Sequence, residues 1–300
     1  MVTDARPDVI RGLFRSAVGV GESFGVMLVR RQGQTVEVAT FRSDGYYSDG
    51  RRPDSVHFGD AEHDVLRRDF TINGLFYDPL ADRIIDLVGG VDDLKQGLLR
   101  TIGDPGDRFA EDKLRMLRAV RFATTLGFEI DSGTREAIIQ HATDITQVSG
   151  ERIGAEMRRV MVNPNLMQGL QHLRDCGLHQ QVFAELESID WNLLQSMREQ
   201  PQAWTFPFSL AAMVSTMLDP SSVPSSLIDR WRLSNLEVRR ADSALHHWRS
   251  IATADQQKWS EIQPILLHRD IDAILWLADT RVKVEKLDTS GLNLAQIGRA

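Results

Sequence analysis

The apolar positions of the chain follow two different periods. In the first third, short runs rich in β-branched residues alternate with polar ones, which is typical of strands. Such runs predict strands over 24–30 and 35–41, joined as a hairpin by Gln32-Gly33-Gln34, and a second hairpin from 75–78 and 83–87. This part of the chain is therefore expected to form a small β-sheet.

Helical spacing accounts for most of the remaining chain. A short helix is predicted over 4–15, with Pro7 near its first turn, where a missing N–H costs nothing. From about Asp92 onward the apolar positions recur at helical spacing to the end, interrupted by turns at prolines such as Pro105 and Pro164. The pattern predicts an α+β fold in which a small mixed β-sheet is followed by an all-α part.

The composition is that of an ordinary globular protein. Its 300 residues, 42% hydrophobic and 26% charged, are enough for two or three domains with a sizeable core. The single cysteine, Cys176, excludes a disulfide framework and a thiolate metal site, and it suits a reducing compartment. No apolar run approaches the roughly 20 residues that a membrane-spanning helix needs. We therefore expect a cytoplasmic protein that does not enter a membrane.

The charge balance leaves room for a phosphate-binding surface. A net charge of −7 argues against a protein coated with basic patches, but a local arginine stripe can still bind phosphate. Lysine is scarce, so arginine carries most of the positive charge. Arginine suits bidentate contacts to phosphate, although genome composition explains the same bias equally well.

The richest candidate chemistry lies in the segment 111–122. On a continuous helix, Asp112 and Arg115 are three residues apart and share a face, and Arg118 and Arg121 continue the stripe. A carboxylate beside a guanidinium can pair with the exocyclic amine and ring nitrogen of cytosine or adenine, while the arginines hold phosphate oxygens. The alternative is a solvated helix face laced with salt bridges, which describes most charge runs of this kind.

A second cluster, Arg67-Arg68-Asp69-Phe70, stands before the second predicted hairpin. Two arginines followed by an aspartate can hold a triphosphate or a ribose hydroxyl, and a local salt bridge is the alternative. Upstream, residues 43–59 form a polar stretch rich in Gly, Asp and Arg. Unstructured stretches of this length are usually functional or disordered.

Glu37 is a candidate carboxylate on a strand. Alternation places it on the face opposite Val36 and Val38, and a single carboxylate there is usually just the solvated side of a sheet. Glu37 can instead be one of several carboxylates that hold Mg²⁺ for two-metal phosphoryl transfer. It is therefore the one candidate catalytic residue, as a third carboxylate of such a site.

Four segments of the chain follow one another in a familiar order: Phe41-Arg-Ser-Asp44, Asp64 to Asn73, Glu111 to Phe122 and Ser149-Gly-Glu-Arg152. In order and spacing they resemble the motifs of the class II tRNA nucleotidyltransferase and poly(A) polymerase family. The resemblance runs over about residues 3–165. It implies a nucleotidyltransferase that adds C and A from CTP and ATP to tRNA 3′ ends without a nucleic-acid template, with Mg²⁺ as cofactor.

The resemblance also implies roles for individual residues. Asp112 and Arg115 would be the amino-acid template that pairs with CTP or ATP. Residues 43–59 look like the family's flexible loop, which is linked there to the switch from C to A addition. The residues that would contact the nucleotide, mostly through its phosphates, are Arg68, Arg118 and Arg121, and Asp69 is a further nucleotide-binding candidate.

The implied domains are a partial nucleotidyltransferase head (1–90), a helical neck that binds nucleotide and RNA (91–165) and a helical body that binds RNA (166–300). In the family, an Asp-x-Asp metal motif precedes the stretch that resembles Val2-Thr3-Asp4, and this chain begins there. We therefore expect an N-terminally truncated member of the family, whose metal ligands are unknown. Membership of the family does not by itself predict that this chain is active. The alternatives are a poly(A) polymerase acting on RNA 3′ ends and a non-catalytic nucleotide- or RNA-binding relic.

Overall fold

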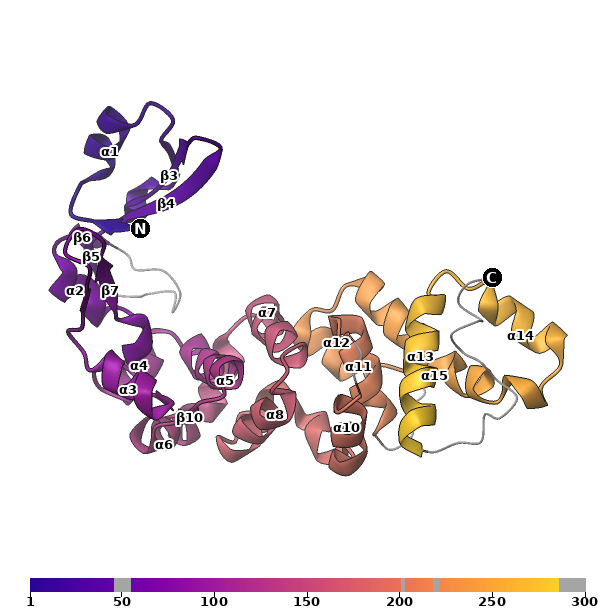
Figure 1. The fold of residues 1–300 in the computed structure, drawn as a ribbon. Helices are drawn as coiled ribbons and strands as arrows, with labels where there is room; N and C mark the ends of the chain where they lie inside the picture. Colours follow the sequence, from indigo (N-terminus) through magenta and orange to yellow (C-terminus); the bar gives the residue numbers. More distant parts are fainter. Residues whose placement is uncertain (46–54, 201–202, 218–221, 286–300) are drawn as a thin grey trace. The chain divides into compact units, whose positions relative to one another are not determined.

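The computed structural model describes residues 1–45, 55–200, 203–217 and 222–285. The chain forms two compact units, Met1–His141 and Ala142–Ala300 (Figure 1). The first unit combines small sheets with helices and the described part of the second is helical, so the predicted α+β fold is confirmed. The finer division into head, neck and body at residues 90 and 165 remains a prediction.

A four-stranded sheet begins the first unit, with the strand order β1-β4-β3-β2. Its strands are β1 (Val2–Thr3), β2 (Val18–Gly21), β3 (Val26–Arg31) and β4 (Gln34–Thr40). The first predicted hairpin is confirmed, because β3 and β4 pair antiparallel with Arg31 opposite Gln34. Gln32 and Gly33 make the turn with φ of 49° and 77°, a left-handed conformation that glycine adopts without steric cost.

Helix α1 (Pro7–Leu13) covers one face of this sheet, where Ile10 packs in one cluster with Met27, Val29 and Val38. The helix is shorter than the predicted span of 4–15. It begins at Pro7, whose fixed φ suits the first helical position. It ends before Phe14, whose backbone is extended.

The rest of the first unit alternates short strands with helices. These elements are β5 (Arg42–Asp44), β6 (Val56–Phe58), α2 (Ala61–Leu66), η2 (Thr71–Asn73), β7 (Phe76–Asp78), β8 (Arg83–Ile85), α3 (Gly90–Gln96), β9 (Leu98–Leu99), α4 (Pro105–Glu111), α5 (Leu114–Leu126), β10 (Glu129–Ile130) and α6 (Ser132–His141). The second predicted hairpin is confirmed as β7 and β8. The expectation of helix throughout after Asp92 fails at the parallel pair of β9 and β10. Strands of two residues are too short to leave an alternating signal.

The structure corrects the expected helix over 111–122. Helix α4 ends at Glu111, Asp112 is extended with φ −143° and ψ 103°, and α5 begins at Leu114. The Asp112 carboxylate accepts a hydrogen bond from the Leu114 N–H at 3.0 Å. Aspartate competes for backbone N–H groups in this way, which is why it favours helix ends over helix interiors.

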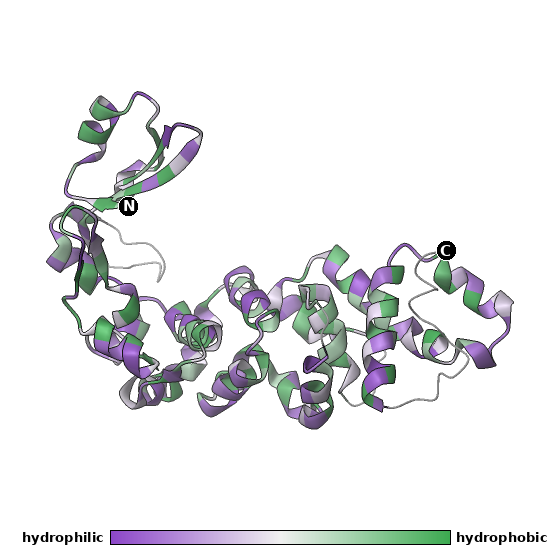
Figure 2. Cartoon of the chain, in the orientation of Figure 1, coloured by the Kyte–Doolittle hydropathy of each residue, from purple (hydrophilic) through white to green (hydrophobic). Residues whose placement is uncertain are grey.

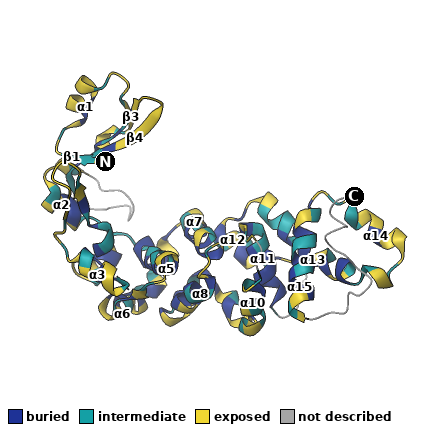
Figure 3. Ribbon diagram, in the orientation of Figure 1, coloured by how far each residue is buried: buried dark blue, intermediate teal, exposed yellow. Residues whose placement is uncertain are grey.

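The second unit is built from helices over its described residues. They are η3 (Ala142–Gln147), α7 (Gly150–Met161), α8 (Leu166–Asp175), α9 (His179–Val182), η4 (Ala184–Ser188), α10 (Trp191–Arg198), α11 (Phe206–Ser215), α12 (Ser225–Trp231), α13 (Asn235–Ala252), η5 (Ala254–Gln256), α14 (Trp259–Leu266) and α15 (Ile271–Glu285). Helix α13 packs against α11 and α15. Buried apolar residues on these helices include Leu210, Leu245 and Leu277. Figures 2 and 3 colour the ribbon by hydropathy and by burial. Among the helices that the structure describes, none is long and apolar enough to span a membrane.

Helices α7 and α12 approach each other closely at Gly154. A Cβ atom at this position would overlap the backbone carbonyl of Trp231, so only glycine allows the contact. Next to it, Arg158 donates through Nε and Nη2 to the two carboxylate oxygens of Glu237, at 2.6 and 2.8 Å. Glu237 also forms a capping box with Ser234 at the start of α13. The pair therefore joins α7 to α13 beside the glycine contact.

Candidate functional site

The two arginine-rich segments that stand out in the sequence meet in the first unit. Arg118 on α5 donates to Asp69 through both Nε, at 2.9 Å, and Nη2. Asn73 donates to the other oxygen of the same carboxylate at 3.0 Å. Burial raises the pKa of Asp69, but the charge of Arg118 and these hydrogen bonds outweigh it and hold the pKa below its ordinary value of 3.8. Asp69 is therefore ionised at neutral pH.

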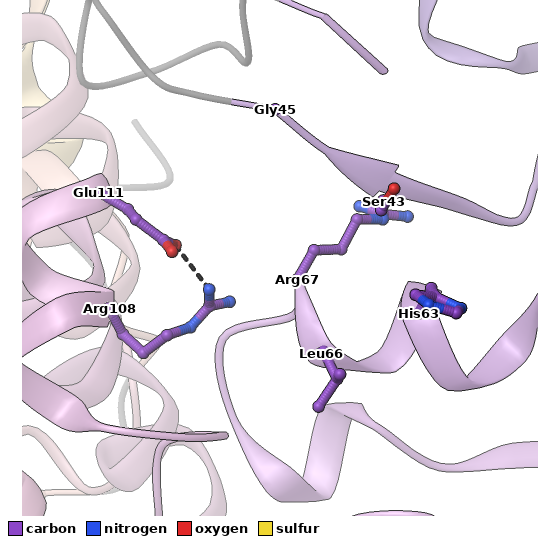
Figure 4. A pocket seen from close by; sticks show the side chains of 7 residues that line it. All are labelled: Ser43, Gly45, His63, Leu66, Arg67, Arg108 and Glu111. Carbon is purple, nitrogen blue, oxygen red and sulfur yellow. Dashed lines mark hydrogen bonds and ion pairs between the residues drawn. The ribbon is translucent and has the colours of Figure 1, made fainter. Parts of the chain in front are cut away.

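Two more arginines donate hydrogen bonds to the backbone just before Asp69. Arg108 donates through Nη2 to the carbonyl of Arg68 at 2.6 Å, and Arg115 donates through Nη2 to the carbonyl of Arg67 at 3.2 Å. One carboxylate oxygen of Glu111 accepts from both, at 2.6 Å from Arg108 and 2.5 Å from Arg115. Figure 4 shows the contact between Glu111 and Arg108. Both guanidinium groups belong to buried residues, so their positions are fixed by packing as well as by charge.

A third carboxylate, Asp64 on α2, holds the adjacent arginines. Its Oδ1 accepts from Arg67 Nε and Nη2 at 2.9 and 2.6 Å. Its Oδ2 accepts from Arg68 Nε and Nη2 at 3.2 and 3.0 Å. Arg68 also donates through Nη1 to the carbonyl of Asn73 at 2.7 Å and stacks over the ring of Phe76 at 4.4 Å.

We refer to these groups as the arginine network: Asp64, Arg67, Arg68, Asp69, Arg108, Glu111, Arg115 and Arg118. Five guanidinium groups share three carboxylates, so ionised side chains leave the network with a charge of +2. On a chain whose net charge is −7, this local excess of positive charge attracts anions to one place.

A pocket of about 200 Å³ opens beside the network. Figure 4 shows its lining side chains, which are Ser43, Gly45, His63, Leu66, Arg67, Arg108 and Glu111. Its volume is below the range of roughly 300–1,000 Å³ that is usual for ligand pockets, so it suits part of a nucleotide rather than a whole one. Guanidinium donors and one carboxylate acceptor line it, which is the combination that can bind polar edges and anionic oxygens.

The residues predicted from the sequence fall into two groups. Four of the six nucleotide-binding candidates belong to the arginine network: Arg68, Asp69, Arg115 and Arg118. Asp112 lies at the junction of α4 and α5, so the expectation that it shares a helical face with Arg115 is wrong. Arg121 continues along α5, with its guanidinium 3.8 Å from the centre of the Phe122 ring. The structure tests the positions of these side chains and leaves their roles as predictions.

The role of Glu37 as a third metal-binding carboxylate remains a prediction. Glu37 is exposed on β4, and its backbone carbonyl accepts from the amino group of Met1 at 2.8 Å. Within the described ranges, no group of three or more His, Cys, Asp or Glu side chains is placed to hold a metal ion. Residues 46–54 of the predicted loop lie outside the described ranges.

Some members of the network were not assigned a role from the sequence. These are Asp64, Arg108 and Glu111, whereas Arg67 was a candidate only as part of the Arg67-Arg68-Asp69 cluster. A local signal for them exists, because Arg67 and Arg68 follow Asp64 by three and four residues and Glu111 follows Arg108 by three. That spacing predicts a pair, but the contacts to the carbonyls of Arg67 and Arg68 have no sequence signature.

Comparison with known protein families gives two matches. A family described as "Poly A polymerase head domain" matches residues 1–100, and one described as "Probable RNA and SrmB- binding site of polymerase A" matches residues 127–190. The first segment of the arginine network, residues 64–69, lies inside the first match. The second segment, residues 108–118, lies between the two matches. The comparison therefore covers the first of the two segments and flanks the second.

Curated and solved relatives point the same way. The CCA-adding enzyme of Geobacillus kaustophilus is 41% identical over 249 residues, which are 82% of this chain and 60% of the relative. That of Ligilactobacillus salivarius is 35% identical over 242 residues, 78% of this chain and 58% of the relative. The crystal structure of the Bacillus stearothermophilus CCA-adding enzyme in complex with CTP superposes with a TM-score of 0.70 at 27% identity, covering 99% of this chain and 70% of that one. The chain thus spans about three fifths of the length of these curated relatives.

Proposed function

Because the chain belongs to the tRNA nucleotidyltransferase and poly(A) polymerase family, we propose that it binds CTP and ATP and acts in adding C and A nucleotides to tRNA 3′ ends. The single observation that carries the proposal is the contact between Asp69 and Arg118, which joins the two arginine-rich segments into one positively charged network. The names of the relatives support tRNA as the acceptor, since both curated relatives above are CCA-adding enzymes. We place the reaction in the cytoplasm, where the buried Cys176 stays reduced.

In the proposed reaction, the terminal hydroxyl oxygen of the tRNA attacks the α-phosphorus of the nucleotide. A new P–O bond forms, the bond from the α-phosphorus to the oxygen of the β-phosphate breaks, pyrophosphate leaves, and the proton of the hydroxyl passes to solvent. Catalysis of such a transfer consists mainly of holding the reactants in line and neutralising charge on the phosphates. A network with a charge of +2 supplies the second of these.

The proposal divides the nucleotide among different side chains. Arg68, Arg118 and Arg121 bind phosphate oxygens. Asp69, which is ionised, accepts a hydrogen bond from a ribose hydroxyl at the edge of its pair with Arg118. Asp112 and Arg115 face the base, as acceptor and donor. Glu111 and two backbone carbonyls fix the guanidinium of Arg115.

Magnesium enters the proposal only through the family, in which it is the cofactor. The described residues offer no cluster of metal ligands, so no step is assigned to an ion held by them. What this chain's own side chains contribute is nucleotide binding and charge neutralisation. These two contributions can be tested separately from turnover.

The test combines incorporation with binding. Labelled CTP and ATP are offered, with Mg²⁺, to tRNA lacking its 3′ end and to an unrelated RNA, and equilibrium binding of CTP is measured in parallel. Arg118→Ala is compared with Arg11→Ala, which removes an exposed arginine paired with Glu22 on the surface. We expect the chain to bind CTP, Arg118→Ala to lose binding and Arg11→Ala to retain it.

The outcomes separate the candidate functions. Incorporation into tRNA alone supports CCA addition. Incorporation of A into both RNAs supports a poly(A) polymerase, a candidate favoured by the match of residues 1–100 to a poly(A) polymerase head domain. Binding of CTP without incorporation supports a nucleotide-binding protein. If the chain binds neither CTP nor ATP, the proposal is overturned.

A further inference from the structure

The carboxylate of Asp64 is among the most buried polar groups of the first unit. The residue is 0% exposed, yet both of its oxygens are occupied by guanidinium groups. Each oxygen takes two N–H donors from a different arginine, Oδ1 from Arg67 and Oδ2 from Arg68. The backbone N–H of Arg42, the first residue of β5, donates to Oδ1 as well, at 3.3 Å. One buried carboxylate therefore fixes two adjacent arginines and the start of a strand.

The shared contact with Asp64 counteracts the tendency of the side chains of Arg67 and Arg68 to move apart. Neighbouring guanidinium groups carry like charges and repel each other, and each has several rotatable bonds. The negative charge of Asp64 offsets the repulsion, and its hydrogen bonds restrict the rotation of both side chains, because Arg67 and Arg68 bind the two oxygens of one carboxylate. Arg68 is held further by the Asn73 carbonyl and the Phe76 ring. Its five N–H donors make three bonds among the described residues, so two still point away from Asp64.

We propose that Asp64 is the positioning residue for nucleotide binding: it holds Arg67 and Arg68 in the geometry that receives the triphosphate, without touching the nucleotide itself. This inference rests on the proposed function. It concerns the phosphates only, since the base is assigned to other side chains. Asp64 therefore affects CTP and ATP equally and leaves the choice between them unchanged.

Two physical effects predict opposite results for Asp64→Asn. If charge alone decided binding, removal of a negative group would raise the network from +2 to +3 and tighten the binding of an anion. If positioning decides, the arginines separate and binding weakens. We expect weakening, by about tenfold for both CTP and ATP, the scale of one lost charge-assisted hydrogen bond.

The experiment measures dissociation constants of CTP, ATP and CMP for the 300-residue chain and for Asp64→Asn by calorimetry. The ratio of CTP to CMP affinity is the decisive quantity, because general damage to the fold lowers both affinities together. The matched control is Asp93→Asn, which removes the charge of another buried aspartate, one that binds Arg100 and Thr71. We expect the ratio to fall in Asp64→Asn and to stay unchanged in Asp93→Asn. An equal or higher ratio in Asp64→Asn overturns the inference.

A second variant covers the case in which Asp64→Asn fails to fold. Arg68→Lys keeps the charge but cannot make the two-nitrogen contact with Asp64 and the bond to Asn73 together. The inference predicts a lower CTP to CMP ratio in Arg68→Lys, and an unchanged ratio contradicts it. A double-mutant cycle with Arg68→Gln adds a further check, since Asp64→Asn should have a smaller effect once Arg68 is gone and only Arg67 still depends on Asp64. If the unaltered chain binds no nucleotide, the proposed function fails instead.

Discussion

Two groups of arginine–carboxylate contacts, the arginine network in the first unit and the pair of Arg158 with Glu237 in the second, are arranged differently. In the first unit, the five guanidinium groups of the arginine network share three carboxylates. In the second, Arg158 meets Glu237 as one charge against one, with two parallel hydrogen bonds. The network keeps a charge of +2 that an anionic ligand can neutralise, whereas the charges of Arg158 and Glu237 cancel. The excess positive charge of the network is the property that favours it, and not the pair of Arg158 with Glu237, as the proposed nucleotide site.

The surroundings of the two arrangements agree with this difference. Arg158 and Glu237 lie beside the tight contact of α7 with α12, and Glu237 also caps α13. The arginine network lies beside a pocket and receives its arginines from two helices and the segment after α2. We therefore expect changes at Arg158, Glu237 and Gly154 to alter stability but not nucleotide binding, and changes in the network to alter nucleotide binding.

The largest effect is expected at the contact of α7 with α12. Gly154→Ala places a methyl group against the carbonyl of Trp231, and neither backbone can move without shifting a helix. We expect the free energy of unfolding to fall by about 3 kcal/mol, the upper range for overpacking a buried contact. Urea unfolding followed by circular dichroism measures it.

A matched glycine controls for the substitution itself. Gly12 lies within α1, and a Cβ there meets nothing within 4 Å. Gly12→Ala should raise stability by about 0.5–1 kcal/mol through helix propensity. If Gly154→Ala is as harmless as Gly12→Ala, the helices do not depend on that close approach. A loss of CTP affinity in folded Gly154→Ala would break the proposed separation between the two regions.

The next effect compares one arginine from each region. The side chains of Arg118 and Arg158 are similarly exposed, at 32% and 28%, and each pairs with one partly buried carboxylate. Replacing either by alanine should cost about 2 kcal/mol of stability, because a carboxylate is left without its partner. Only Arg118→Ala should weaken CTP binding, by about tenfold or more. Calorimetric titration measures the CTP affinity of both variants, and urea unfolding measures their free energies of unfolding. A loss of CTP binding in Arg158→Ala would contradict the comparison.

The sequence predicted what is local and what the family motifs carry. The hairpin of β3 and β4 follows from alternation and one turn, and both lie within about 15 residues of chain. The pairing of Asp69 with Arg118 joins residues 49 apart, and no period or propensity specifies it. The break at Asp112 escaped prediction because the apolar stripe of α5 begins just after it and looks continuous with α4. Long-range contacts of polar side chains depend on the whole fold, so they appear only in the structure.

The smallest expected effect is a loss of stability at low pH, which results from protonation of Glu237 in the second unit. The hydrogen bonds from Arg158 and Ser234 outweigh burial and lower the pKa of Glu237 from 4.5 to about 2. A carboxylate with a depressed pKa binds its proton more readily in the unfolded chain, so its stabilisation is fully present above about pH 4.5. It is lost as the pH falls toward 2. Because the pair is partly exposed to solvent, we expect a contribution of only about 1–2 kcal/mol.

Glu237→Gln isolates this contribution from the other acids of the chain. The variant should be less stable than the unaltered protein at pH 6, and the gap should close as the pH falls below 4.5. Urea unfolding at a series of pH values measures the gap directly. A gap that stays constant down to pH 3 would show that Glu237 stabilises the joint through shape and hydrogen bonding rather than charge. The two regions would then differ in how their carboxylates act, because the network requires ionised carboxylates to hold its arginines and the joint does not.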